Sequence, residues 1–360
     1  MRRLASAGAF RAVGRARGPG QHLCVRRQQH VLRRPGRRPA GGTVNTGELA
    51  VAGLGIVAPG VLGPEGALAP AVEVSPGWFR ADVALPGRGY RRLPDACKYL
   101  LAASRLAVGD AGDRFARTER NLRAAAVAVN NTGAALLEEL DHTIMREGAD
   151  AMSPSSSPFI AMSSFAGRLS MEHDITGFNL TVNSPVTAGI EALRIAARAV
   201  AAGRAAAVLV GAVEEALSPS QATGPRTEAG AVVLHCEPAA GASARYGTCR
   251  ARGAFLDPGA AAADAAAVLG PLVGEDPPGR IDAVLDDSPV GAAAARWLDR
   301  LGGACEVVVV PSPAQAGCLA PLRRVLGLFA QEHPAPARRA VLAASAQGTL
   351  ACAELTVAPR

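Results

Sequence analysis

Short apolar runs alternate with longer segments of helical period along residues 49–235. The runs consist of small and β-branched residues, which favour buried strands. The longer segments repeat apolar residues every three to four positions, as helices do. The predicted strands lie within 49–60, which ends in a Gly/Pro turn, and over 124–129, 178–182, 205–213 and 231–235. The predicted helices cover 93–111, 134–146, 159–171 and 187–200. This alternation is typical of an α/β fold with a mostly parallel sheet.

The pattern is weaker beyond residue 236. The Ala- and Gly-rich stretch 237–244 is expected to be a loop, and 306–310 is expected to be a further buried strand. The chain has 360 residues, of which 49% are apolar and 19% charged, so it can bury a large core. No run of 18 uncharged apolar residues occurs, and the sequence therefore predicts no membrane span.

Charge is unevenly distributed, because residues 1–43 contain eleven arginines and no acidic residue. The remainder holds 27 basic groups against 31 acidic ones. Three interpretations of the basic segment stay open: an arm for nucleic acid or an anionic surface, a targeting peptide, or translated sequence upstream of a true start near Val44. Lysine occurs once against 37 arginines, which suggests a GC-rich genome more than a nucleic-acid site. We expect a disordered tail over 1–45 and no nucleic-acid partner.

Neither the cysteines nor the glycines indicate a cofactor. The seven cysteines form no C-x-x-C pair, and we expect buried free thiols of a cytoplasmic protein, without a zinc site. Gly53 and Gly55 lack the third glycine of a dinucleotide-binding loop, and Pro59 blocks the helix that such a loop would open. The sequence therefore predicts no cofactor and no metal.

The segment 166–189 carries the most specific motif of the chain. Ala-Gly-Arg-Leu at 166–169 opens it, Gly-Phe at 177–178 precedes a short strand, and a turn at 184–187 leads into a helix. This order, without a gap, resembles the region around the nucleophile of the β-ketoacyl synthase family, where the turn reads T-A-C-S-S. Val186 stands at the position of the cysteine. Residues 49–60 and 205–213 also resemble the family, and residues beyond 280 resemble it more weakly.

The resemblance implies a thiolase-like fold, in which two similar α/β halves form five layers around a buried central helix. That helix is expected over 187–200, because its alanines and glycine suit close packing between sheets. The first half is expected over 46–245 and the second, in shortened form, over 246–360.

The residues at the family's catalytic positions do not suit condensation. That reaction needs a thiolate to accept the acyl group, and usually two histidines to stabilise the developing oxyanion. By the resemblance, Asp287 occupies the first histidine position, where its carboxylate would repel that charge. Gly317 or Cys318 occupies the second position. Since Val186 can neither ionise nor attack, we expect no condensation activity from this chain alone.

Other side chains near the motif have simpler interpretations. Ser184 and Thr187 could act as nucleophiles if a base lay within reach, but they are also suited to cap the helix. Asp286 and Asp287 could hold a metal, although a turn before a Ser-Pro pair explains them equally well. His173, between two acidic residues, is expected to face solvent.

Three functions are compatible with the resemblance. The first is a non-catalytic subunit that pairs with an active ketosynthase in polyketide or fatty acid biosynthesis, as chain length factors do, although those tend to have glutamine where this chain has Val186. The second is an acyltransferase or hydrolase that uses Ser184 or Thr187. The third is a module that binds acyl groups or an acyl carrier protein. Residues expected to line the tunnel or the interface, with ordinary core as the alternative, are Phe159, Ile160, Met162 and Phe165.

Overall fold

The computed structural model describes residues 47–154, 157–217, 220–221, 228–240, 244–274, 276–303, 305–312 and 317–360. The predictions for the tail 1–45 lie outside the described residues. Contacts group residues 44–360 into one compact unit, and the boundary near residue 245 between two halves stays a prediction.

Ten strands of the described chain join in one sheet, in the order β3-β2-β4-β5-β1-β6-β10-β9-β7-β8. The strands of the first part are β1 (Leu49–Val57), β2 (Arg123–Val129), β3 (Asn179–Asn183), β4 (Ala207–Glu214) and β5 (Gly230–Pro238). Those of the second part are β6 (Gly247–Phe255), β7 (Arg280–Leu285), β8 (Glu306–Pro311), β9 (Ala337–Ala344) and β10 (Thr349–Val357). β1 and β6 are antiparallel and connect the two parts through three residue pairs, from Leu49↔Cys249 to Val51↔Gly247.

The two sets of five strands repeat one topology. β2 pairs in parallel with β3 and β4, and β5 lies antiparallel between β4 and β1. In the same way β7 pairs in parallel with β8 and β9, and β10 lies antiparallel between β9 and β6. The strand order of the second set therefore mirrors that of the first, as expected for two similar α/β halves.

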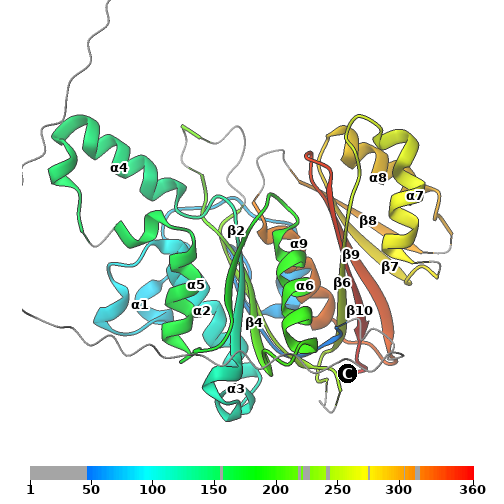
Figure 1. Cartoon of the computed structure of the whole chain (residues 1–360), viewed down its shortest axis with the longest axis horizontal. Helices are drawn as coiled ribbons and strands as arrows, with labels where there is room; N and C mark the ends of the chain where they lie inside the picture. The colour runs from blue at the N-terminus through cyan, green and yellow to red at the C-terminus, as the bar shows by residue number, and fades with distance from the viewer. Residues whose placement is uncertain are drawn as a thin grey trace, which may run out of the picture. The chain divides into compact units, whose positions relative to one another are not determined.

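Helices cover both faces of each set of strands. α2 (Asp95–Asp110) and α5 (Ser163–Glu172) pack on the outer face of the first set, and α7 (Ala261–Val273) and α8 (Pro289–Asp299) on that of the second. Between the two sets lie α6 (Ala188–Ala201) and α9 (Leu319–Ala330), which contact strands of both (Figure 1). The order helix, sheet, helix, sheet, helix confirms the predicted five-layered thiolase-like fold.

The central helix α6 is buried because its side chains are small. Ala188, Ala192 and Ala196 are fully buried in a core cluster that also contains residues of α9 and of both sheets. A Cβ on Gly189 would lie 3.0 Å from Leu322 Cβ and 3.2 Å from the Cys318 carbonyl oxygen, so only glycine allows α9 to approach this closely. Gly203 follows the helix at φ +66, and its N–H bonds to the Val200 carbonyl, as the predicted C-cap requires.

Two buried arginines of α9 connect the second half of the chain to its first half. Arg323 Nε donates to the Ala67 carbonyl at 2.9 Å, and Arg324 Nε donates to Asp282 Oδ2 of β7 at 2.6 Å. Both arginines are almost fully buried, and Asp282 is completely so. These bonds join η1 (Pro64–Leu68), α9 and β7, so the start and the end of the described chain pack as one body.

The remaining elements are short or peripheral: α1 (Ala81–Ala84), α3 (Arg114–Arg117), α4 (Ala134–Glu147), η2 (Arg88–Tyr90), η3 (Arg120–Leu122), η4 (Ala149–Ala151) and η5 (Ser157–Ile160). One expected helix is shorter than predicted, because the segment 159–171 begins as η5 and becomes helical only at Ser163. No helix within the described ranges has both the length and the apolar character needed to cross a membrane.

Candidate functional site

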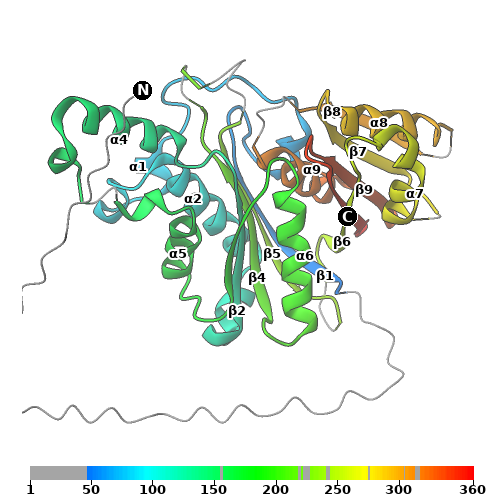
Figure 2. The same ribbon diagram turned by 45° about the horizontal axis from the view of Figure 1, so that its top comes forward.

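The turn between β3 and α6 retains the backbone of a nucleophile elbow. Val186 has φ +60, a left-handed conformation that is a genuine outlier for a β-branched residue. Its side chain is 4% exposed and belongs to the central core cluster. Figure 2 shows α6 leaving this turn alongside the first set of strands. The elbow geometry is therefore present, and a hydrocarbon side chain occupies its tip.

The hydroxyls at the elbow do not cap α6. Thr187 stands at the N-cap position, but its side chain accepts no bond from the helix N–H groups. Instead, Thr187 Oγ1 donates to Glu191 Oε1 at 2.8 Å, one helical turn along. Ser184 is half-buried, and its side chain has no described role at the helix start. The predicted cap is therefore absent at Thr187, whose φ of −78° and ψ of −19° are helical and not the extended backbone of a capping residue.

The two positions at which the second family histidine was expected carry Gly317 and Cys318, and a carboxyl group from β4 lies beside them. The Gly317 carbonyl accepts the Val186 N–H at 3.2 Å, which ties residues 317–318 to the elbow. Glu214 Oε1 accepts the Cys318 N–H, and Glu214 Oε2 accepts the Asn131 N–H, both at 2.8 Å. A Cβ on Gly317 would lie 2.3 Å from Glu214 Cδ, so no larger residue fits beside this carboxyl.

Burial changes the ionisation of the groups around the elbow. It raises the pKa of Glu214 to about 8, and the charge of Glu228 adds to this effect. The pKa of Glu228 is also raised by burial, while Leu319 N–H donates to its Oε2 at 3.4 Å. Cys318 brings a thiol to this loop, but burial first and Glu214 second raise its pKa well above the usual value. The thiol therefore stays protonated at neutral pH and is a poor nucleophile.

Asp287 lies in the turn between β7 and α8 and is exposed. Its neighbour Asp286 accepts the Ser288 N–H at 3.1 Å, and Ser288 Oγ accepts the Gly291 N–H, which caps α8. The turn interpretation of this acidic pair is what the structure shows. No hydrogen bond or ion pair within the described part of the chain joins Asp287 to the elbow.

The four side chains expected at the tunnel or interface fall into different environments. Phe165 is fully buried in the core under α2 and α5, and Phe159 packs beside it with ring centroids 5.7 Å apart. Met162 is half-buried against the same core. Ile160, in contrast, is 48% exposed. The structure therefore places Phe165 in ordinary core, with Phe159 and Met162 packed against it. A role of these four residues at an interface stays a prediction.

His173 does not face solvent, contrary to expectation. Its Nε2 lies 2.7 Å from the buried Ser104 Oγ of α2, and burial lowers its pKa to about 4. Its neighbour Glu172 is engaged by Arg105 Nε at 2.8 Å and by the Tyr90 hydroxyl. Only Asp174 of the three is exposed. Both half-buried side chains anchor the end of α5 to α2 and lie on the outer face of the sheet, away from the elbow.

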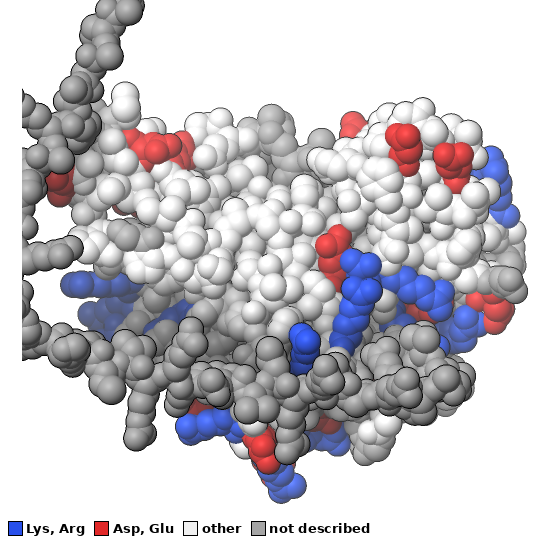
Figure 3. All heavy atoms as spheres, in the orientation of Figure 1, with Lys and Arg blue, Asp and Glu red and all other residues white. Residues whose placement is uncertain are grey.

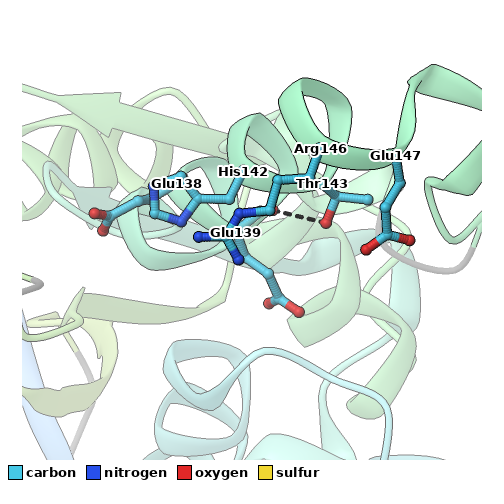
Figure 4. A pocket seen from close by; sticks show the side chains of 6 residues that line it. All are labelled: Glu138, Glu139, His142, Thr143, Arg146 and Glu147. Atoms are coloured by element: carbon cyan, nitrogen blue, oxygen red, sulfur yellow. Dashed lines mark hydrogen bonds between the residues drawn. The ribbon is translucent and has the colours of Figure 1, made fainter.

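A separate hollow of ≈ 360 Å³ lies on α4 (Figure 4). The residues that line it all belong to this one helix, and they are Glu138, Glu139, His142, Thr143, Arg146 and Glu147. The Thr143 hydroxyl donates to the Glu139 carbonyl at 2.9 Å, as hydroxyls in helices commonly do. None of these residues belongs to the elbow, so the two features are distinct.

Sequence reasoning missed Glu214 and Glu228 as residues of the site. Asn131 and Cys318, the partners of Glu214, lie 83 and 104 positions away in the chain, and Leu319, the partner of Glu228, lies 91 positions away, which no local pattern reveals. One signal was available: Glu214 directly follows the buried strand predicted over 205–213, at the strand end where the elbow was also expected. In open α/β sheets such strand ends carry the functional side chains.

Comparisons with known proteins agree with this geometry. Residues 79–269 match the family described as beta-ketoacyl synthase, N-terminal domain. A curated relative, 3-oxoacyl-[acyl-carrier-protein] synthase 2 of Vibrio harveyi, is 29% identical over 131 residues, which is 36% of this chain and 31% of that protein. The match therefore spans about a third of the relative's length.

Solved structures share the fold over most of the chain. The ishigamide ketosynthase/chain length factor superposes with a TM-score of 0.66 at 20% identity, covering 87% of this chain and 100% of that one. A chain of a type II PKS acyl-carrier protein complex with its ketosynthase bound to the hexaketide gives 0.63 at 14% identity, covering 86% and 99%. Since the family match extends over more than half of the sequence, the chain belongs to the β-ketoacyl synthase family.

Proposed function

We propose that this chain is a non-catalytic, chain-length-factor-like subunit that pairs with an active β-ketoacyl synthase in polyketide or fatty acid biosynthesis. The observation that carries the proposal is Val186, buried at the tip of an intact elbow. A hydrocarbon side chain cannot form the acyl thioester through which the family works. The pair would act in the cytoplasm.

The surroundings of the elbow support the absence of condensation. An oxyanion hole needs free N–H donors aimed at the developing charge. The Val186 N–H is already bonded to the Gly317 carbonyl, and Glu214 fills the space beside Gly317. Asp287 lies exposed in a turn and offers no imidazole. Substituting one residue would therefore not rebuild the catalytic site.

The edge of the first set of strands supports a role in pairing. Among the described strands β3 pairs with β2 alone, so its other edge is open to another chain. Exposed apolar side chains occur in β3 and in the elements that precede it: Leu180 (38%) in β3, Met171 (71%) in α5, which packs on β3, and Ile160 (48%) in η5, which contacts α5. Figure 3 shows that uncharged side chains dominate the middle of the face on which α5 and α6 lie. An uncharged face beside an open strand edge is suited to bury against a partner of similar fold.

The partner and the carrier are proposed on the same grounds. We expect Ile160 and Met162 to contact the ketosynthase, and Phe159 and Phe165 to support that surface from the core. One solved structure with this fold is a ketosynthase/chain length factor, and another holds an acyl-carrier protein in complex with its ketosynthase. By analogy, an acyl carrier protein would deliver substrate to the pair.

Co-expression with a ketosynthase that keeps Cys-His-His, taken from a neighbouring gene where one encodes it, tests the proposal. We expect a one-to-one heterodimer in native mass spectrometry, and a product profile that changes when this chain is omitted. Ile160→Asp should weaken the complex, while Val83→Asp, at another exposed apolar position, should leave it intact. A chain that never associates with the ketosynthase would contradict the proposal.

One observation supports the alternative of altered acyl chemistry. The Thr187 hydroxyl lies 2.8 Å from the Glu191 carboxylate, which is within reach of a general base. If this pair were catalytic, an acyl thioester donor would label this chain alone, and Thr187→Val would abolish labelling while Ser184→Ala would not. Carrier-protein binding by a chain that stays monomeric would instead favour the simple binding module.

A further inference from the structure

One buried carboxyl group connects three segments that are far apart in the sequence. Glu214, at the end of β4, is completely buried. Its Oε1 accepts the N–H of Cys318, which precedes α9, and its Oε2 accepts the N–H of Asn131, which follows β2. Both distances are 2.8 Å, the usual length of a good hydrogen bond to a carboxyl oxygen. Glu214 therefore fixes the positions of two loops at once.

The fixed loop lies directly on the elbow. Gly317 precedes Cys318, and its carbonyl accepts the Val186 N–H at 3.2 Å. A left-handed valine persists only where its surroundings determine it, because the strain is of the order of 1–3 kcal/mol. The bond to Gly317 is one such restraint on the elbow at Val186, and Glu214 holds Gly317 in place through Cys318.

Glu214 also fills space that another side chain would need. A Cβ at Gly317 would lie 2.3 Å from Glu214 Cδ and 2.4 Å from its Oε1. The resemblance places a family histidine at Gly317 or at the next residue. A histidine at 317 would collide with this carboxyl and could stand there only if Glu214 moved.

A second carboxyl group from the first half supports the same arrangement. Glu228 Oε2 accepts the Leu319 N–H at 3.4 Å, so both carboxyls face the N–H groups at the start of α9. These groups have no partner within the helix and favour negative charge.

We propose that Glu214 is the positioning residue that keeps the elbow closed: through the Cys318 N–H it holds residues 317–318 against Val186. The inference rests on the proposed non-catalytic function in treating the elbow as a closed position. It also implies that Val186→Cys alone would give a buried, unreactive thiol. Opening the elbow would require the loss of Glu214 as well.

Local opening of the full-length chain tests the proposal. In Glu214→Gln the amide NH₂ opposes one of the two N–H donors, so one of the two bonds is lost and residue 214 no longer links the two loops, which loosens both. We expect iodoacetamide to alkylate Cys318 about tenfold faster, read peptide by peptide in the mass spectrometer, because about 1.4 kcal/mol of lost restraint corresponds to a factor of ten. Hydrogen exchange should accelerate at Asn131 and Cys318 together and stay unchanged in β7. Glu237→Gln, a carboxyl outside this site, is the matched control and should change neither.

Gly317→Ala tests the same contact from the opposite side, even if Glu214→Gln folds poorly. The added methyl collides with Glu214, so alkylation of Cys318 should accelerate, whereas Gly270→Ala, which meets open space, should have no effect. If Cys318 is alkylated no faster in either variant, Glu214 does not have this role. The same conclusion follows if hydrogen exchange accelerates as much in β7 as at Cys318. Since these measurements use this chain alone, a failure to pair with a ketosynthase would refute the proposed function and leave this inference intact.

Discussion

The two central helices begin in different ways although they occupy equivalent places in the two halves. α6 starts after the left-handed Val186, with no side chain accepting its first N–H groups. α9 starts after Cys318, where Glu214 and Glu228 of the first half accept the N–H groups. The strand order repeats, but the chemistry at the helix starts does not. The fold thus retains the elbow, while two acidic side chains of the first half hold the start of α9 beside it.

The strands β2 and β7 sharpen this contrast. Both begin with arginine and continue with small and apolar residues, but β7 has Asp282 where β2 has Ala125. Ala125 needs no partner in its buried position, whereas Asp282 is held by Arg280 and Arg324. The first half is therefore stabilised by apolar packing at this level, and the second by a buried ion cluster.

The largest effect is expected from breaking that cluster. Asp282→Ala leaves Arg324 buried without its carboxylate, and we expect the free energy of unfolding to fall by about 3–5 kcal/mol. Asp276→Ala removes the partner of Arg338, but Asp276 is 86% exposed, and the loss should stay below about 1 kcal/mol. Urea unfolding measures both. Equal losses would mean that β7 does not depend on its buried carboxylate.

The carboxyl that closes the elbow should make stability depend on pH. The pKa of Glu214 is raised to about 8 by burial, with Glu228 adding to it and the Cys318 thiol facing it. The folded chain therefore keeps this proton to a higher pH than the unfolded chain, whose pKa is near 4.5. This contribution is fully present below pH 4.5 and is lost as the pH rises through 8, by about 3–5 kcal/mol at about 1.4 kcal/mol per pKa unit.

Unfolding by urea between pH 5 and pH 9 measures this slope. Glu214→Gln carries no titrating group and should flatten the decline, while Glu237→Gln should keep it. A decline that is the same in all three proteins would assign it to other groups.

The smallest effect concerns strain at the elbow. Left-handed backbone costs a residue with a Cβ roughly 1–2 kcal/mol, and glycine avoids this cost. Val186→Gly should therefore be at least as stable as Val186→Ala, although it buries less. In β3 the order should reverse, with Val182→Gly less stable than Val182→Ala by about 0.5–1 kcal/mol. The same order at both positions would show that Val186 is unstrained.

The first half could be predicted from the sequence because its apolar runs are bounded clearly. The elements around β1, β2, β3, β4 and α6 lie within about two residues of their predicted positions. The register that placed Val186 at the elbow relied on one ungapped motif, and the left-handed backbone agrees with it. Local patterns were sufficient here because each element is short and regular.

The second half and the closure of the elbow could not be predicted in the same way. α7 is so rich in alanine that it offers no contrast between its faces, and α9 carries Arg323 and Arg324 inside the core. His173 looked exposed because its neighbours are acidic, yet Ser104 on a distant helix buries it. Partners of this kind come from tertiary packing, which a single sequence does not display.

The placement of α6 between two sheets also determines when the protein can fold during synthesis. One face of α6 packs on β2, β3 and β4, of which β2 and β3 precede it in the sequence. The other face packs on β6 and β10, which are translated only with residues 247–357. Arg323 then reaches back to the Ala67 carbonyl, 256 positions earlier. Contacts of such long sequence separation form slowly. A ribosome that has finished α6 therefore carries a chain in which one apolar face of this helix stays uncovered until the second set of strands has been made.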